Sequence, residues 1–163
     1  MIQILPATTI EHFETISGLA HTIWHEHYIK IISVAQIAYM LEKFNSVSHM
    51  TARAKDGTLY FYLTDHDVPV GYVGIDCHKD HLYISKLYVL KESRGKGIAK
   101  KVIQHTVALA KDQGVSLVRL HVNKYNANSI TFYKKMGFEI TDSVIEDIGQ
   151  GFVMDDYLMA KRI

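Results

Sequence analysis

The chain has 163 residues, the usual size of one domain, and we expect a single domain over residues 1–163. Hydrophobic residues make up 48% and charged residues 21%, which is typical of a globular protein and excludes a disordered or fibrous chain. With 18 Lys and Arg against 17 Asp and Glu, the formal net charge is +1. This balance removes the electrostatic argument for a nucleic-acid or membrane-surface partner.

The only cysteine, Cys77, has no second thiol with which to form an internal disulfide, so the composition favours a reducing compartment. We expect Cys77 to be a buried, inert thiol. No apolar run reaches the roughly 18 residues of a membrane span, and Met1 to Pro6 lacks the features of a signal peptide. These observations predict a cytoplasmic protein.

The first part of the chain carries two helix signals. Thr8 and Glu11 have capping-box spacing, and the apolar residues behind them recur at intervals of three and four as far as about His27. Ser33 and Gln36 repeat the capping arrangement before a second, shorter apolar stripe. We therefore predict two helices in succession.

The pattern then changes to short runs of aromatic and branched residues separated by polar turns. These runs predict three antiparallel strands, at 59–63, 70–75 and from 82 to about 89. The elements predicted after them are a long helix from 98 that ends before Gly114, a strand at 117–122, a helix at 129–136 and two terminal strands at 138–148 and 152–159.

A strand, a long helix and a second strand in succession imply a right-handed crossover, and therefore one parallel pair within an otherwise antiparallel sheet. Helices must cover the faces of this sheet, which makes the fold class α/β (α+β). Ligands bind such sheets beyond the carboxyl ends of the strands where the topology changes. Here those ends lie near Val89 and Val122, and we expect the functional site between them.

The segment from Arg94 to Ala99 stands between a strand and the long helix, where free backbone N–H groups and the positive end of the helix dipole converge. Two glycines in this turn allow the backbone to approach a pyrophosphate closely. The dinucleotide fingerprint fails because Lys100 replaces its third glycine, and no Gly-Lys-Ser/Thr loop for a nucleoside triphosphate is present. The phosphate must belong to another ligand.

The turn reads Arg-x-x-Gly-x-Ala and follows Leu87-Tyr88-Val89. After the next strand comes Asn126-x-x-Ser129-x-x-x-Tyr133-x-x-x-Gly137-Phe138. The combination, which spans about Leu82 to Phe138, resembles the GCN5-related N-acetyltransferase (GNAT) family. The resemblance implies a mixed, mostly antiparallel sheet whose central parallel strand pair is splayed at the cofactor site. Ser85 and Lys86 interrupt the apolar run of one such strand, as a bulge would; Lys86 solvated on an edge strand is an equal alternative.

The resemblance also implies acetyl-coenzyme A as cosubstrate. We expect no metal. His21 with His25, and His78 with His81, lack the further ligands that a zinc site needs. The cofactor-binding residues carried over from the family are Leu87, Tyr88, Val89, Arg94, Gly95, Lys96, Gly97, Ile98, Ala99, Asn123, Asn126, Ser129 and Tyr133.

Tyr133 matches the family tyrosine near the coenzyme sulfur, where its phenol would protonate the departing thiolate. Many members carry a glutamate as general base on the strand before the turn, but residues 83–89 contain no acid. We expect the base elsewhere and name Glu26 as the candidate. His25, His27, Asp76 and a chain of water molecules stay open as alternatives.

The stretch from Trp24 to Tyr28, with Gln36-x-x-Tyr39-Met40, resembles the bacterial spermidine/spermine acetyltransferase branch. It predicts Trp24, His27 and Tyr28 as acceptor-binding residues. Asp155 and Asp156 are expected to be exposed charges on a sheet edge.

The predicted function is transfer of an acetyl group to a primary amine, such as a polyamine or another small amine, by direct attack. The alternatives are a non-catalytic acyl-coenzyme A sensor of the same fold and a protein N-terminal acetyltransferase. We expect a small-molecule amine as the partner, no nucleic acid and no membrane, and a homodimer is favoured because terminal strands in this fold often pair between subunits.

Overall fold

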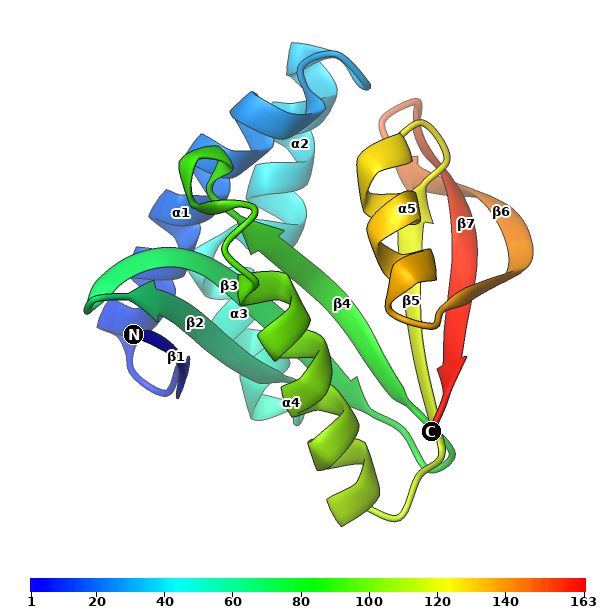
Figure 1. The fold of residues 1–163 in the computed structure, drawn as a ribbon. Helices are drawn as coiled ribbons and strands as arrows, with labels where there is room; N and C mark the ends of the chain where they lie inside the picture. Colours follow the sequence, from blue (N-terminus) through cyan, green and yellow to red (C-terminus); the bar gives the residue numbers. More distant parts are fainter.

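One seven-stranded sheet is the centre of the computed structural model, which describes residues 1–163 (Figure 1). In chain order the elements are β1 (Ile2–Pro6), α1 (Ile10–Tyr28), α2 (Val34–Asn45), α3 (Val47–Lys55), β2 (Leu59–Asp65), β3 (Val68–Cys77), β4 (Leu82–Val89), a 3₁₀ turn (Lys91–Ser93), α4 (Ile98–Asp112), β5 (Leu117–Asn123), α5 (Ala127–Lys135), β6 (Glu139–Gly149) and β7 (Phe152–Arg162).

The strand order is β1-β2-β3-β4-β5-β7-β6, and every neighbouring pair is antiparallel except β4 and β5. This confirms the predicted sheet with one central parallel pair. The parallel ladder is short, because only Leu82–Ile84 of β4 pair with Val118–Leu120 of β5. Figure 1 shows the two strands close together at one end and spread apart at the other.

A bulge in β4 lies where the two strands begin to separate. Ile84 pairs with Ile75 of β3 and Lys86 pairs with Gly74, so Ser85 is one extra residue on β4. The Ser85 hydroxyl donates a hydrogen bond of 3.2 Å to the Gly74 carbonyl, which holds the bulge against β3. Bulges bend a strand and increase its twist. The irregularity predicted here is confirmed, and Lys86 lies on a central strand rather than on an edge.

Helices cover both faces of the sheet. Helices α4 and α5 lie on one face, and α1, α2 and α3 lie on the other (Figure 1). Each face has its own apolar core. Ile84, Val102 and Leu120 belong to the core under α4, and Ile16, Ile37 and Tyr72 belong to the core under α1–α3. None of the helices is both long and apolar enough to cross a membrane.

Two elements were not predicted, and two local expectations are wrong. Strand β1 pairs with β2 at the sheet edge, and α3 buries only Met50, so neither element has a long apolar pattern. The first helix is capped by Thr9, whose hydroxyl accepts from the His12 N–H, and not by Thr8. Cys77 is exposed because it ends β3 at the turn into β4.

Strands β3 and β4 approach each other closely at Gly71. A Cβ at Gly71 would overlap the Tyr88 carbonyl oxygen and lie 3.2 Å from the Val89 Cα, so Gly71→Ala must push the two strands apart. We expect a loss of about 2 kcal/mol in the free energy of unfolding, measured by denaturant titration. Gly18→Ala is the control: it lies in exposed α1 with no atom within 4 Å of the added Cβ. It should gain about 0.5–1 kcal/mol. Equal changes in the free energy of unfolding in the two variants would contradict this close approach of β3 and β4.

Candidate active site

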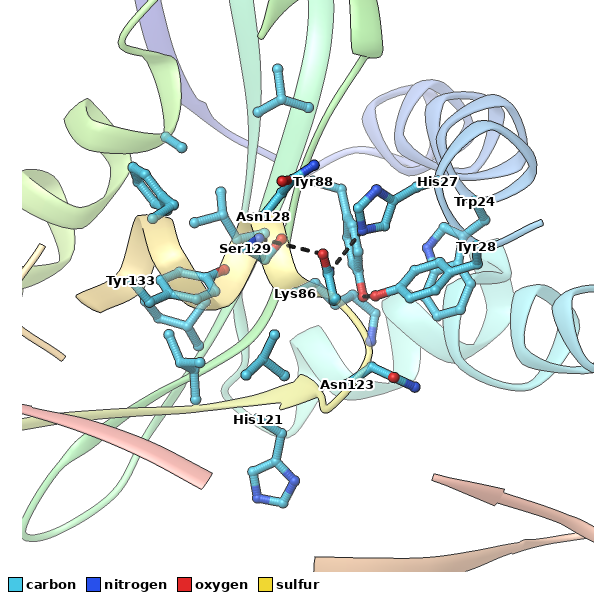
Figure 2. A pocket seen from close by; sticks show the side chains of 18 of the residues that line it. Trp24, His27, Tyr28, Lys86, Tyr88, His121, Asn123, Asn128, Ser129 and Tyr133 are labelled. Atoms are coloured by element: carbon cyan, nitrogen blue, oxygen red, sulfur yellow. Dashed lines mark hydrogen bonds between the residues drawn. The ribbon is translucent and has the colours of Figure 1, made fainter. Parts of the chain in front are cut away.

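The spread ends of β4 and β5 open into a cavity of about 550 Å³. The turn before α4 and helix α5 line one side, and α1 and α2 line the other, with β7 at the far end. Figure 2 shows Trp24, His27 and Tyr28 of α1 across the cavity from Tyr133 of α5. This cavity therefore lies where the sequence predicts the site, beyond the carboxyl ends of the parallel strands.

The turn before α4 supplies an anion-binding end. Gly95 and Gly97 have φ values of +79° and +80°, which favour glycine, and no atom lies within 4 Å of the missing Cβ positions. Gly97 caps α4 without a side-chain acceptor, so the first N–H groups of the helix are free. The Arg94 Nε donates to the Val89 carbonyl at 3.1 Å, which fixes its guanidinium beside the turn.

Most of the predicted cofactor-binding residues line this cavity. They are Leu87, Tyr88, Val89, Arg94, Gly95, Gly97, Ile98, Ala99, Asn123, Asn126, Ser129 and Tyr133. Lys96 does not line it, because its ammonium lies 3.5 Å from the Asp65 carboxylate on the outer side of the turn. Beyond the bulge, residues 87–89 of β4 have no strand partner on the β5 side, so that edge of their backbone is open to a ligand.

Tyr133 is held by α5, which begins where Asn126 accepts a hydrogen bond from the Ser129 N–H. Its ring packs against Phe138 with 5.6 Å between the centroids, but its hydroxyl makes no hydrogen bond within the protein and lines the cavity. Burial, and then the nearby Tyr28, raise the pKa of Tyr133 well above its usual range. The phenol therefore stays protonated and is available as a donor.

The wall that α1 forms is a hydrogen-bonded aromatic cluster. The Trp24 indole N–H donates to the Tyr72 hydroxyl at 3.1 Å, and the Tyr28 and Tyr88 hydroxyls lie 3.3 Å apart. The rings of Trp24 and Tyr28 pack with 4.6 Å between their centroids and an angle of 37° between their planes. Burial raises the pKa of Tyr28 to about 12, so this wall carries no charge at neutral pH. It offers a rigid apolar surface with polar tips.

His27 joins the two sides of the cavity. Its Nε2 accepts a hydrogen bond from the Asn126 side-chain amide at 2.8 Å, the contact drawn beside His27 in Figure 2. Burial, and then the charge of Arg94, lower the pKa of His27. Its Nε2 lone pair is therefore already occupied, its basicity is reduced, and the side chain links α1 to the start of α5.

The other candidates for the general base lie away from the cavity. Glu26 is exposed, and its carboxylate accepts a hydrogen bond of 3.3 Å from the Lys91 N–H. His25 contacts the His21 carbonyl, and Asp76 accepts hydrogen bonds from Arg53 and Thr58. None of the three lines the cavity. The catalytic role of Glu26 stays a prediction without support from its position.

Asp156 is a cavity residue whose environment the sequence did not indicate. Strand β7 lies between β5 and β6, so the expectation of exposed edge charges is wrong for this residue. Asp156 is 2% exposed and lines the cavity, and no hydrogen bond to its carboxylate is formed within the protein. The His121 Nδ1 lies 3.8 Å from one carboxylate oxygen. Asp155, by contrast, pairs with Lys124 at 2.6 Å.

Burial is the main cause that raises the pKa of Asp156 to about 6, and the negative charges of Glu146 and Asp155 add to it. Burial lowers the pKa of His121, whose ring meets Tyr83 edge to face at 5.5 Å. The carboxylate of Asp156 therefore titrates just below neutral pH beside a largely uncharged imidazole.

Lys86 extends into the cavity from the bulge of β4, as Figure 2 shows. Burial lowers the pKa of its ammonium to about 8, although Asp76 opposes the shift. It makes no ion pair. No group of three or more His, Cys, Asp or Glu side chains is arranged to hold a metal ion.

The raised pKa of Asp156 predicts how stability depends on pH. The unfolded carboxyl titrates near 3.8 and the folded one near 6, so the folded state holds the extra proton between these values and loses stability as pH rises through them. Asp156→Asn should therefore be more stable than wild type by about 2 kcal/mol at pH 7–8, with no difference below pH about 4. Denaturant titrations at a series of pH values measure the free energy of unfolding of wild type and of the variant. Asp142→Asn, on exposed β6, should change stability by less than about 0.5 kcal/mol throughout.

The chain matches the model of the Acetyltransferase (GNAT) family over residues 19–138. It is 33% identical over 117 residues to the peptidyl-lysine N-acetyltransferase YjaB of Salmonella typhimurium, covering 71% of this chain and 72% of that protein. It is 23% identical over 152 residues to the spermidine N(1)-acetyltransferase of Thermoplasma acidophilum, covering 90% and 92%.

Among solved structures, the PaiA N-acetyltransferase of Thermoplasma acidophilum in complex with coenzyme A has the same fold, with a TM-score of 0.84, 23% identity and coverage of 100% of this chain and 99% of that one. The family match spans most of the chain and includes the glycine-rich turn and Tyr133. The chain therefore belongs to the GNAT family of acyl-coenzyme A-dependent N-acetyltransferases, as its sequence predicts, with acetyl-coenzyme A as the cosubstrate.

Proposed function

We propose that this enzyme transfers the acetyl group of acetyl-coenzyme A to the primary amine of a small molecule, by direct attack of the amine on the thioester. The observation that carries the proposal is the single cavity that joins the glycine-rich start of α4 to Tyr133 and to the aromatic wall of α1. A cofactor and an acceptor that enter from its two sides would meet beside the open edge of β4.

The anion-binding end suits the pyrophosphate of the coenzyme. The free N–H groups at the start of α4 and the guanidinium of Arg94 would hold it, since a helix N-terminus favours negative charge. The pantetheine arm would then form hydrogen bonds with the backbone of residues 87–89, which lacks a β5 partner. This places the thioester near the bulge, within the part of the cavity that Tyr133 lines.

The reaction needs no covalent enzyme intermediate. The amine nitrogen attacks the thioester carbon, and a carbon–nitrogen bond forms as the carbonyl electrons move to oxygen. Backbone N–H groups at the bulge would stabilise that oxyanion. When the carbon–sulfur bond breaks, Tyr133 would donate its proton to the thiolate, and it regains one from the nitrogen. The free hydroxyl of Tyr133 favours this role over a packing role alone.

A small acceptor is favoured over a protein N-terminus because α2 is bound to the β6–β7 hairpin. The Gln36 side-chain amide donates to the Val153 carbonyl at 2.9 Å, and the Tyr39 hydroxyl donates to the Ile148 carbonyl at 2.6 Å. The rings of Tyr39 and Phe152 pack at 5.3 Å. A polypeptide that crossed the acceptor side would have to break these contacts. Peptidyl lysine and spermidine, named for two relatives, both offer a primary amine on an alkyl chain.

The release of free coenzyme A, measured with acetyl-coenzyme A and a panel of primary amines, tests the proposal. The panel contains polyamines, lysine and its analogues, peptides with a lysine side chain and peptides with a free N-terminus. We expect release above the hydrolytic background with at least one small amine. Binding of acetyl-coenzyme A without release in any arm would instead support the sensor function.

The position of the pyrophosphate is tested by a matched pair of glycine variants. Gly97 and Gly114, before and after α4, have φ values of +80° and +73°, and neither has an atom within 4 Å of an added Cβ. Gly97→Asp and Gly114→Asp should therefore cost similar stability. Only Gly97→Asp places a carboxylate at the anion site, and calorimetry should show a dissociation constant for acetyl-coenzyme A at least about tenfold higher, equivalent to 1.4 kcal/mol. Equal affinities in the two variants would exclude this binding position.

The role of Tyr133 is tested by Tyr133→Phe, which removes only the hydroxyl. We expect kcat to fall on the order of a hundredfold, because general acid catalysis is typically worth that much, with the KM for acetyl-coenzyme A little changed. Tyr125→Phe, at a position that is 71% exposed, is the control and should keep the wild-type rate. Single-turnover rates separate chemistry from product release. If they match wild type in Tyr133→Phe, the tyrosine only packs.

A further inference from the structure

We propose that Asp156 binds the ammonium form of the acceptor and takes its proton before the nitrogen attacks the thioester. This inference rests on the proposed function and assigns the base that the enzyme requires. Asp156 replaces Glu26 in that role, and His121 beside it is a positioning residue.

The carboxylate of Asp156 has no hydrogen-bond partner in the protein, although the residue is 2% exposed. A buried polar group without a partner costs free energy, and a buried charge costs more. The surface of Asp156 that remains open faces the cavity, which it lines together with His121 and Tyr83. A cation that enters the cavity would supply the missing partner, and a protonated amine is such a cation.

The charged groups around Asp156 favour a cation as well. Glu146 of β6 and Asp155 of β7 act on it with negative charge. Lys124, after β5, is the one positive group whose charge opposes this effect, but its ammonium lies 2.6 Å from the Asp155 carboxylate and is largely neutralised there. Three further titratable groups face Asp156: His121 of β5, Tyr83 of β4 and Tyr28 of α1. These three are uncharged at neutral pH, because burial lowers the pKa of the histidine and raises those of both tyrosines.

The three protons of the ammonium go to three different places. The ammonium gives one proton to a carboxylate oxygen of Asp156, and the neutral amine then forms the carbon–nitrogen bond. A second nitrogen proton replaces the one that Tyr133 gives to sulfur, and the third stays on the amide. Asp156 releases its proton to solvent, so each turnover yields the amide, coenzyme A and one proton. Removal of the amine from water lowers its pKa and favours the first step, while the adjacent carboxylate opposes this shift. Attack of the neutral amine on the thioester then removes it and draws the proton transfer forward.

His121 is a weaker candidate for the same role. Burial lowers the pKa of its imidazole, so the ring carries no charge at neutral pH that would attract an ammonium, whereas the Asp156 carboxylate does. The Nδ1 of His121 is 3.8 Å from Asp156, close enough to limit the rotation of the carboxylate but too far for a hydrogen bond. Substitution of each residue in turn therefore distinguishes the role of Asp156 from that of His121.

Asp156→Asn is the decisive variant, because it keeps the shape and removes the base. With an amine that wild type accepts, kcat/KM should rise with pH to about 6 in wild type and then level off. In Asp156→Asn it should be on the order of a hundredfold lower at pH 7 and rise continuously toward the pKa of the amine, because only free amine from solution reacts. The KM for acetyl-coenzyme A should stay within about twofold.

Asp155→Asn is the matched control, one residue along β7 and outside the cavity. Its kcat/KM should reach the same plateau as that of wild type. The rise of kcat/KM at low pH, the acid limb of the profile, should move to lower pH, because Asp155 helps to raise the pKa of Asp156. Asp156→Glu restores a carboxylate and should restore the acid limb with a lower plateau. Calorimetry of the amine with the coenzyme A complex gives a readout without turnover, in which Asp156→Asn should bind the amine at least about tenfold more weakly.

Three results would overturn the proposal. The first is a pH profile of Asp156→Asn that is parallel to that of wild type. The second is loss of the acid limb in His121→Gln but not in Asp156→Asn, which would make the histidine the base. The third is equal profiles in Asp156→Asn and Asp156→Glu. If wild type binds acetyl-coenzyme A but acetylates no amine, the proposed function fails and this inference fails with it.

Discussion

The end of pairing between β4 and β5 is the constraint on which the rest of the structure depends. Three residues of each strand form the parallel ladder, and the bulge at Ser85 then turns β4 away. Without this separation, residues 87–89 would pair with β5, and neither the open backbone edge nor the cavity would exist. A hydrogen bond between His27 and Asn126 connects α1 to the start of α5 across the gap. The fold gives up sheet hydrogen bonds at its centre and gains a binding surface.

The two ends of the cavity differ in charge, and in the proposed mechanism this difference would orient the two ligands. The helix N-terminus and Arg94 form an end that favours anions, while Asp156 and the acidic residues behind it form an end that favours cations. Between them, the aromatic wall is rigid and uncharged. A coenzyme and an ammonium would therefore each have one favourable arrangement, and the reacting atoms would meet where the protein carries little charge of its own. Lys86 is the exception, and its ammonium is kept weakly basic by burial.

Local patterns allowed most of the fold and the cofactor end to be predicted. Glycine spacing, the position of the turn before a helix, and the sequence from Asn126 to Phe138 are all contiguous signals. The acceptor end could not be predicted, because it depends on the insertion of β7 between β5 and β6, which is a property of the whole sheet. Asp156 has the same local sequence whether it lies on an edge or inside. Helix α3 escaped prediction because it buries a single residue, Met50.

The short ladder between β4 and β5 has a consequence for the lifetime of the protein. It is a seam through the sheet: on one side lie β1–β4 with the first three helices, and on the other lie β5, β7 and β6. A coenzyme seated in the gap would touch both sides and act as a brace across the seam. A ligand that binds only the folded state raises the free energy of unfolding, and at concentrations well above its Kd the increase grows with the logarithm of its concentration. Proteolysis that begins by local opening at the seam would then slow as the coenzyme supply rises, so that the abundance of the enzyme follows the availability of its own cosubstrate.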